Sequence, residues 1–170
     1  MKKFFAIAAV ILIAAFVINY SLGGFDSVKP GLISTTDVTY FGSYYEGRYN
    51  SDTLEEIIAS LRSKIEKEGS GVLTIINYQE EDLEKRGIVK QFVGIEWPVQ
   101  APKNHGLDSL YITAYNGVQF RVPIRPLVMP SPKKLIDMAT EMATEMNTVV
   151  QGISIEQYQQ GKLIINFPMK

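Results

Sequence analysis

The chain of 170 residues has no cysteine and a single histidine, His105. Without cysteine it forms neither disulfides nor thiolate metal sites. One histidine excludes the common multi-histidine zinc sites, and a Ser-His-Asp triad would require unusual geometry. We expect His105 in an exposed loop rather than at a haem iron, since no second axial candidate or haem-attachment motif accompanies it.

An excess of charge of one sign is also missing. The 17 Lys and Arg residues nearly balance the 18 Asp and Glu residues, for a net charge of −1. Nucleic-acid binding usually needs a basic face, so we do not predict it. The sequence also lacks a Gly-x-Ser-x-Gly elbow, a Walker loop and a dinucleotide-binding glycine pattern. We therefore predict no catalytic residues, no metal and no cofactor, and we favour a protein that is not an enzyme.

Long hydrophobic runs are limited to the amino terminus. Phe4 to Ile18 is wholly apolar and follows Lys2 and Lys3. This run is shorter than the roughly 20 residues of a full span, but residues 20–22 can extend it to the membrane interface. We predict that residues 1–22 form an uncleaved single-pass anchor in the cytoplasmic membrane. The two lysines place its amino terminus inside and the domain on the periplasmic or extracellular side.

The alternative for this segment is a signal sequence that is cleaved after Gly23. Residues 23–34 contain glycine, proline and serine and are predicted to form a linker. The working domain is predicted to span residues 35–170.

Residues 35–98 are predicted to form a β-α-β-β unit. Its strands are expected at about 36–45, 72–78 and 88–97, with a charged loop or short helical turn at 80–86. Ser51 or Asp52 can cap the helix, which should end before Gly69. Apolar residues at helical spacing give this helix one buried stripe: Leu54, Ile57, Ile58, Leu61 and Ile65.

A linker at 99–108 leads to a second unit of the same order in residues 110–170. Asn116-Gly117 predicts a hairpin between strands at 110–115 and 118–124. Ser131 before Pro132 predicts a second helix. Strands at 153–158 and 162–168 should flank the turn Gln159-Gln160-Gly161. The second helix repeats the stripe of the first with Leu135, Met138, Ala139, Met142 and Met146.

Short sequence matches also support the duplication. Asn77-Tyr78-Gln79 is similar to Gln157-Tyr158-Gln159, and Glu96 stands where Asn166 stands in the second unit. We predict an α+β fold in which duplicated β-α-β-β units form a pseudo-twofold antiparallel sheet with two helices, preceded by one transmembrane helix. One helix covers its half of the sheet only in part, so a concave junction should remain, where ligands commonly bind.

The closing stretch Glu156-Gln157-Tyr158, followed by a hydrophobic strand ending at Pro168, resembles the GyrI-like small-molecule-binding domains. This effector-binding fold is shared with multidrug-sensing transcription regulators and is related to the SOUL haem-binding proteins. The resemblance covers about residues 35–170. It implies that Glu156 pairs with cationic, aromatic ligands. The chain has no recognisable helix-turn-helix, so a role in transcription is not expected.

Together these features predict a membrane-tethered, exported domain that binds a small aromatic or cationic molecule in the cleft between the two repeats. The candidate ligand-binding residues are Glu156, Tyr158, Trp97, Tyr78 and Glu96. An interpretation without a binding site also stays open, in which Glu156 faces solvent and the aromatic rings pack in the core. The alternative functions are a protein-interaction module of a membrane complex and a hydrolase that uses the pocket carboxylates Glu96 and Glu156, one of which activates water.

Overall fold

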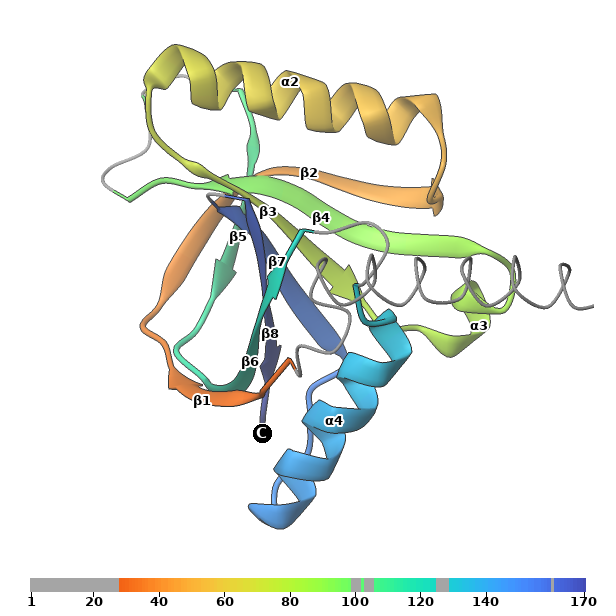
Figure 1. Ribbon diagram of the computed structural model, residues 1–170. Helices are drawn as coiled ribbons and strands as arrows, with labels where there is room; N and C mark the ends of the chain where they lie inside the picture. Colours follow the sequence, from red (N-terminus) through yellow and green to blue (C-terminus); the bar gives the residue numbers. More distant parts are fainter. Residues whose placement is uncertain (1–27, 99–101, 103–105, 125–128, 160) are drawn as a thin grey trace, which may run out of the picture.

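The computed structural model describes residues 28–98, 102, 106–124, 129–159 and 161–170. The elements in chain order are β1 (Gly31–Ser34), β2 (Val38–Arg48), α2 (Asp52–Glu68), β3 (Val72–Tyr78), α3 (Glu81–Glu84), β4 (Ile88–Glu96), β5 (Asp108–Ile112), β6 (Asn116–Pro123), α4 (Pro132–Glu145), β7 (Ile153–Gln159) and β8 (Lys162–Pro168). The strands form one antiparallel sheet in the order β1-β6-β8-β7-β3-β4-β2-β5 (Figure 1).

The predicted anchor, residues 1–22, lies outside the described residues. Within the part of the chain that the structure does describe, no helix has the length and hydrophobicity to cross a membrane. The α+β class is confirmed, and the anchor stays a prediction.

The β-α-β-β order occurs twice, as β2-α2-β3-β4 and as β6-α4-β7-β8. The two units meet at the centre of the sheet, where β3 pairs with β7 and Leu73 lies opposite Tyr158. β4 and β2 extend the sheet on one side of this pair, and β8 and β6 extend it on the other. Outward from the centre, the order is therefore β3-β4-β2 on one side and β7-β8-β6 on the other. These matching orders are what a pseudo-twofold axis requires.

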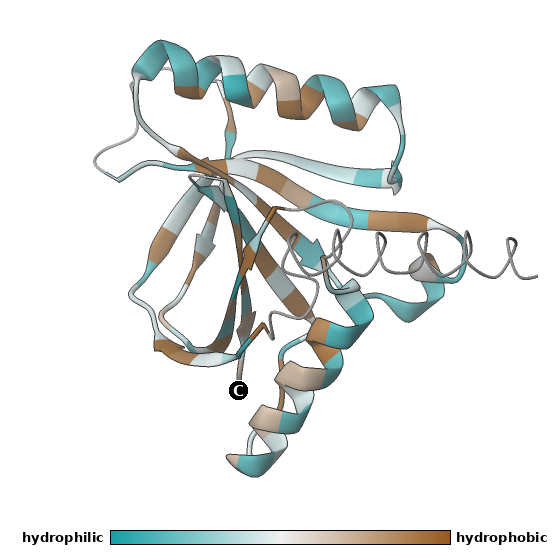
Figure 2. Cartoon of the chain, in the orientation of Figure 1, coloured by the Kyte–Doolittle hydropathy of each residue, from teal (hydrophilic) through white to brown (hydrophobic). Residues whose placement is uncertain are grey.

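α2 begins and ends where the sequence predicts, and α4 begins where it predicts. The Ser51 side chain caps α2 by accepting from the backbone N–H of Leu54, and Gly69 ends this helix with φ of 66°. Ser131 caps α4 by accepting from the N–H of Lys134. The hydrophobic residues of α2 lie mainly on its side towards the sheet (Figure 2). The two helices bury their apolar stripes on the same face of the sheet. Met146 is the exception, since it follows the end of α4 and is exposed.

The predicted hairpin at Asn116-Gly117 is wrong. These residues begin β6, which pairs with β1 and β8 rather than with β5. β5 pairs instead with β2 of the first unit. The segment predicted as a linker before residue 35 accordingly contains a strand, β1. In the observed arrangement β6 forms hydrogen-bonded ladders along both of its edges, whereas a two-residue hairpin would give it a ladder along one edge only. Long-range pairing therefore overrides the local turn signal.

Two long strand segments, 31–48 and 108–123, share one register. Gly31 lies opposite Gln119 and Gly42 opposite Asp108, and the paired residue numbers have the same sum in both ladders. Between the ladders, the Thr35 N–H donates to the Tyr115 carbonyl at 2.9 Å. The two segments are therefore one continuous antiparallel pair, bent in the middle.

This pair closes the sheet on itself. Its inner face, opposite the helices, encloses a hydrophobic cluster of Tyr40, Ile76, Phe92 and Ile155. The outer face carries two clusters, one under each helix, and Tyr158 contacts both. The centre of the outer face, between α2 and α4, is the region that neither helix covers.

Candidate functional site

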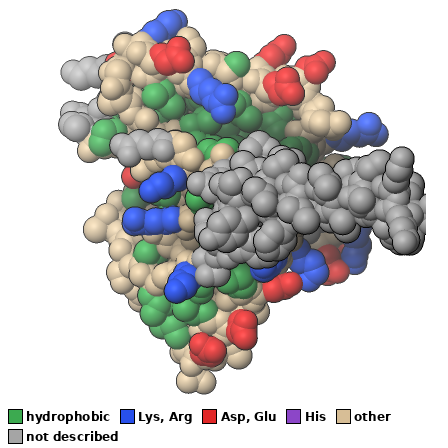
Figure 3. Space-filling model, in the orientation of Figure 1, with side chains coloured by type: hydrophobic (Ala, Val, Ile, Leu, Met, Phe, Trp, Pro, Cys, Tyr) green, Lys and Arg blue, Asp and Glu red, His purple; other side chains and the backbone are tan. Residues whose placement is uncertain are grey.

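A cavity of about 790 Å³ lies between α2 and the start of α4, above the central strands. Its walls are Leu54, Ile58 and Arg62 from α2 and Leu135 and Ile136 from α4. Its floor is mostly apolar and is formed by β3, β7 and β8, with Leu73, Ile75, Leu163 and Ile165. Figure 3 shows hydrophobic side chains gathered below α2 in this view. A cavity of this size and lining suits a small organic molecule.

Successive side chains of β7 point to opposite faces of the sheet. Ser154, Glu156 and Tyr158 all line the cavity, because they share a face with Ile75 and Leu73 of the neighbouring strand. Ile155 and Gln157 point to the inner face. A carboxylate and an aromatic ring thus stand side by side on the cavity floor.

Glu156 is held by two hydrogen bonds. The Asn77 Nδ2 donates to Oε1 at 2.9 Å, and the Tyr158 hydroxyl lies 3.4 Å from Oε2. Burial raises the pKa of Glu156 above its ordinary value, and the bonds from Tyr158 and Asn77 offset part of that rise. The carboxylate is therefore positioned but poorly solvated, so a cation in the cavity would favour its charged form.

The hydroxyl of Tyr158 is affected by the same surroundings. Its pKa is raised, first by burial and then by the nearby Glu156, while Arg62 acts in the opposite direction. Tyr158 therefore stays protonated and donates to the carboxylate. Its ring supplies a flat surface for stacking on an aromatic or cationic group.

The polar network continues from Asn77 to a residue that the sequence analysis did not single out. The Gln91 Nε2 donates to Asn77 Oδ1 at 2.6 Å, and both side chains line the cavity. Gln91 is 4% exposed, and its Oε1 has no hydrogen-bond partner among the described residues. Leaving a buried acceptor unpaired costs roughly 1–3 kcal/mol.

Of the three other predicted residues, one only borders the cavity and two lie elsewhere. Tyr78 borders the cavity, but its ring packs in the cluster on the inner face, with Lys90 Nζ 5.9 Å from the ring centre. Glu96 also lies on the inner face, where it accepts a hydrogen bond from Gln157 and burial raises its pKa. Trp97 packs under α2 with its ring 5.6 Å from that of Phe41, and it does not line the cavity.

Asn77 and Gln91 carried a signal that could have been found in the sequence. Each is a polar residue at a position where strand alternation puts the side chain on the helix-covered face. A polar residue predicted on a buried face is informative because it requires a partner. The similarity of Asn77-Tyr78 to Gln157-Tyr158 obscured this signal, because the two tyrosines lie on opposite faces.

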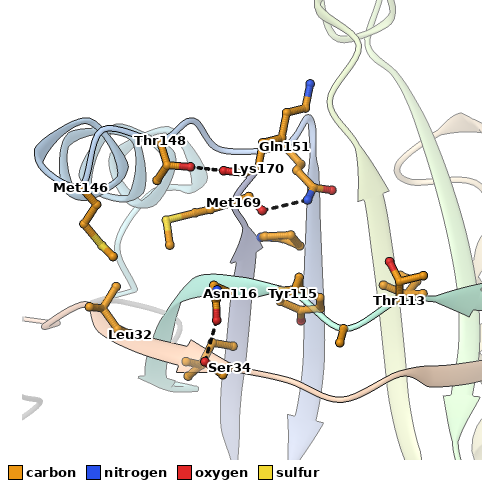
Figure 4. Close-up of a pocket in the computed structure, with 14 residues that line it drawn as sticks. Leu32, Ser34, Thr113, Tyr115, Asn116, Met146, Thr148, Gln151, Met169 and Lys170 are labelled. Carbon is orange, nitrogen blue, oxygen red and sulfur yellow. Dashed lines mark hydrogen bonds between the residues drawn. The ribbon is translucent and has the colours of Figure 1, made fainter.

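A second cavity, of about 730 Å³, lies where the two long strand segments bend (Figure 4). Ser34 and Asn116 are hydrogen-bonded through their side chains on one side of it, at 2.6 Å. Gln151 donates to the Met169 carbonyl on the other side. Apart from Lys170 its lining carries no ionisable carboxylate or amine side chain, so it offers less for charge recognition.

Among the residues that the structure describes, no group of three His, Asp or Glu side chains could hold a metal ion.

No family model and no curated protein sequence matches this chain. Solved structures do. The C-terminal domain of EcmrR is 12% identical, with a TM-score of 0.61 over 84% of this chain and 98% of that one. SAV2435 bound to tetraphenylphosphonium is 15% identical, with a TM-score of 0.51 over 84% and 94%. A hydrolase from Listeria innocua is 13% identical, with a TM-score of 0.56 over 89% and 98%.

These likenesses are consistent with the GyrI-like effector-binding fold that the sequence predicts. At such identities they show the fold alone.

Proposed function

We propose that this protein binds a small aromatic cation in the cavity between α2 and α4. The observation that carries the proposal is a half-buried carboxylate, Glu156, on the mostly apolar floor of the cavity and beside the ring of Tyr158. Apolar walls favour aromatic groups, and a poorly solvated carboxylate favours a positive charge. The fold's likeness to SAV2435, which was solved with tetraphenylphosphonium, supports the same class of ligand.

The test uses two probes of the same shape and opposite charge, tetraphenylphosphonium and tetraphenylborate. We expect the full-length protein to bind the cation and to reject the anion in isothermal titration calorimetry. Glu156→Gln should weaken cation binding by about tenfold, or roughly 1.4 kcal/mol, because the amide keeps the shape but loses the charge.

Glu66→Gln is the matched control. Glu66 is exposed on α2 and does not line the cavity, so the same change of charge should leave the affinity as it is. Equal affinity for the two probes, or equal affinity in wild type and Glu156→Gln, would remove the electrostatic part of the proposal.

The positions of the two glutamates argue against a hydrolase that uses both of them at one site. Glu156 faces the cavity and Glu96 faces the inside of the closed sheet, so the two cannot act on one water. A hydrolase with this fold would depend on Glu156 alone. Turnover of an ester that disappears in Glu156→Gln would favour it over simple binding.

The interaction-module alternative has a specific feature in its favour. β1 and β5 stand at the ends of the strand order, so each has one edge that no described strand pairs with. A peptide can add to such an edge. Specific co-purification of one protein, without binding of either probe, would favour this function. We further propose that residues 1–22 tether the domain to the cytoplasmic membrane, which membrane fractionation of the full-length chain tests.

A further inference from the structure

We propose that the cavity selects a zwitterion, whose positive group pairs with Glu156 on the floor and whose negative group, an oxyanion such as a carboxylate, pairs with Arg62 on the wall formed by α2. This inference rests on the proposed function and adds a second charged group to its ligand class. It makes Arg62 a residue that determines specificity.

Arg62 reaches the cavity because of its position on α2. Leu54, Ile58 and Arg62 all line the cavity, and their spacing of four residues puts them on one face of the helix. Exposure increases along this row, from buried Leu54 through half-buried Ile58 to exposed Arg62. The Arg62 side chain therefore lies where the cavity meets solvent, and Figure 3 shows positively charged side chains bordering the hydrophobic ones below α2.

The charge of Arg62 is not used by another side chain. Lys90, which also lines the cavity, forms a salt bridge with Glu80 at 2.7 Å. Glu55 lies near the start of α2, about 10 Å from Arg62 along the helix axis, which is too far for an ion pair. Within the part of the chain that the structure describes, Arg62 forms no salt bridge. Its guanidinium group is therefore available to a ligand.

Arg62 and Glu156 both act on the hydroxyl of Tyr158. This hydroxyl lies 3.4 Å from Glu156 Oε2. Burial raises its pKa most, Glu156 raises the pKa further, and Arg62 lowers it. Glu156 and Arg62 do not form a salt bridge with each other, although both line the cavity. Two opposite charges therefore border one mostly apolar cavity and leave space between them.

A simple cation satisfies only half of this arrangement. Glu156 attracts it and Arg62 repels it, and an apolar cavity screens neither effect as well as water does. A zwitterion with its charges in the complementary order is attracted at both ends, and a guanidinium can bind an oxyanion through two parallel N–H groups. Charge complementarity therefore favours a zwitterion over a cation of the same shape.

The experiment compares triphenylphosphonium ions that carry an alkyl arm ending either in a carboxylate or in its neutral amide. The arms are 2-carboxyethyl, 4-carboxybutyl and 5-carboxypentyl, and each acid has the rings and shape of its amide. Calorimetry uses the full-length wild-type protein at a pH where the carboxylates of probe and protein are ionised. We expect one arm length to fit best, and its acid to bind about three- to tenfold more tightly than its amide.

Arg62→Gln then tests which residue recognises the carboxylate. Gln is a good helix former at this exposed position, so the fold should be kept. The preference for the acid should disappear, and the amide should bind as well as before or slightly better, because the repulsion of the cation is gone. Circular dichroism melting checks that the variant is folded.

Lys67→Gln is the matched control. Lys67 is exposed on the same helix and does not line the cavity, so the variant loses the same charge and should keep the preference for the acid. Glu156→Gln should weaken the binding of acid and amide alike.

The outcomes separate the two levels of the argument. If every acid binds wild type no more tightly than its amide, or if the preference survives in Arg62→Gln, the role of Arg62 is wrong and the cation site stands. If none of the probes and no tetraphenylphosphonium binds, the proposed function itself fails.

Discussion

The charge of Glu156 depends on what occupies the cavity. Burial disfavours the ionised carboxylate, and hydrogen bonds from Tyr158 and Asn77 recover only part of the loss. A bound cation would recover more, so binding and ionisation are linked. This linkage gives the site a dependence on pH that an exposed glutamate would lack.

We expect tetraphenylphosphonium affinity to rise with pH, from the pKa of Glu156 in the complex to its raised pKa in the ligand-free protein. Below this range the carboxyl is neutral and offers no charge. Calorimetry in buffers of different ionisation enthalpy should show proton release on binding. Glu156→Gln should show neither the pH dependence nor the proton release that belongs to this group.

The ligand-free protein should show the reverse sign. The folded state holds the Glu156 proton more tightly than the unfolded state does, so the free energy of unfolding falls as pH rises from about 4.5, the ordinary value for glutamate, through the raised pKa of Glu156. The stability of wild type relative to Glu156→Gln should therefore decrease with pH in denaturant titrations. A difference that increases with pH would contradict the burial of this carboxylate.

At the level of elements, the two helices form the cavity walls and depend on their caps. Ser51 and Ser131 occupy the same position at the start of α2 and α4. Ser51 has a second role, since its Oγ also lies in hydrogen-bond contact with the hydroxyl of Tyr45 in β2, at 2.5 Å. Ser131 Oγ contacts only its own helix in the described bonds.

We expect Ser131→Ala to cost about 1 kcal/mol of stability, as a lost cap usually does. Ser51→Ala should cost more, by up to about another 1 kcal/mol, because it also leaves a part-buried hydroxyl with one partner fewer. Urea unfolding of the two variants measures the difference. Equal losses would show that the contact with Tyr45 adds nothing to the cap.

The sequence predicted these elements well where the information is local. Helix periodicity, the caps at Ser51 and Ser131 and the glycine at position 69 are all read within a few residues. Strands β3, β4, β7 and β8 also lie close to their predicted bounds. The exception is the hairpin predicted between β5 and β6. Asn116-Gly117 misled because the partner of β6 is β1, more than 80 residues earlier in the chain.

The site was predictable in part for the same reason. Alternation along β7 correctly placed Glu156 and Tyr158 on one face. Whether Glu96 and Tyr78 lie on that same face depends on the register between strands, and a single sequence does not reveal this register. Gln91 of β4 lies directly opposite Asn77 of β3. Its hydrogen bond to Asn77 therefore became evident only once the two strands were aligned.

At the scale of the whole molecule, the sheet contains very close backbone approaches, and the closest is at Gly42. Gly42 of β2 lies opposite Gly94 of β4, and a Cβ at Gly42 would come within 2.0 Å of the Val93 carbonyl oxygen. No side chain fits there without moving the two strands apart. By contrast, a Cβ at Gly31 in β1 would be 3.9 Å from its nearest neighbour, the Gln119 carbonyl oxygen.

We therefore expect Gly42→Ala to destabilise the protein by about 3 kcal/mol or more, or to prevent folding. Gly31→Ala should change stability by no more than about 0.5 kcal/mol. Thermal unfolding of the two variants, each a single added methyl group in the same bent strand pair, measures this contrast. A mild effect at Gly42 would mean that the sheet can open at this point.

The exchange of β1 and β5 between the two units also defines how the molecule is assembled. Each unit supplies a strand that completes the other, so the chain is equivalent to a domain-swapped dimer whose subunits are joined by a peptide connection at residues 97–107. Two separate units would associate only as far as their concentration allowed. Joined in one chain, they meet in an intramolecular step, and the cavity at their junction is retained at any dilution.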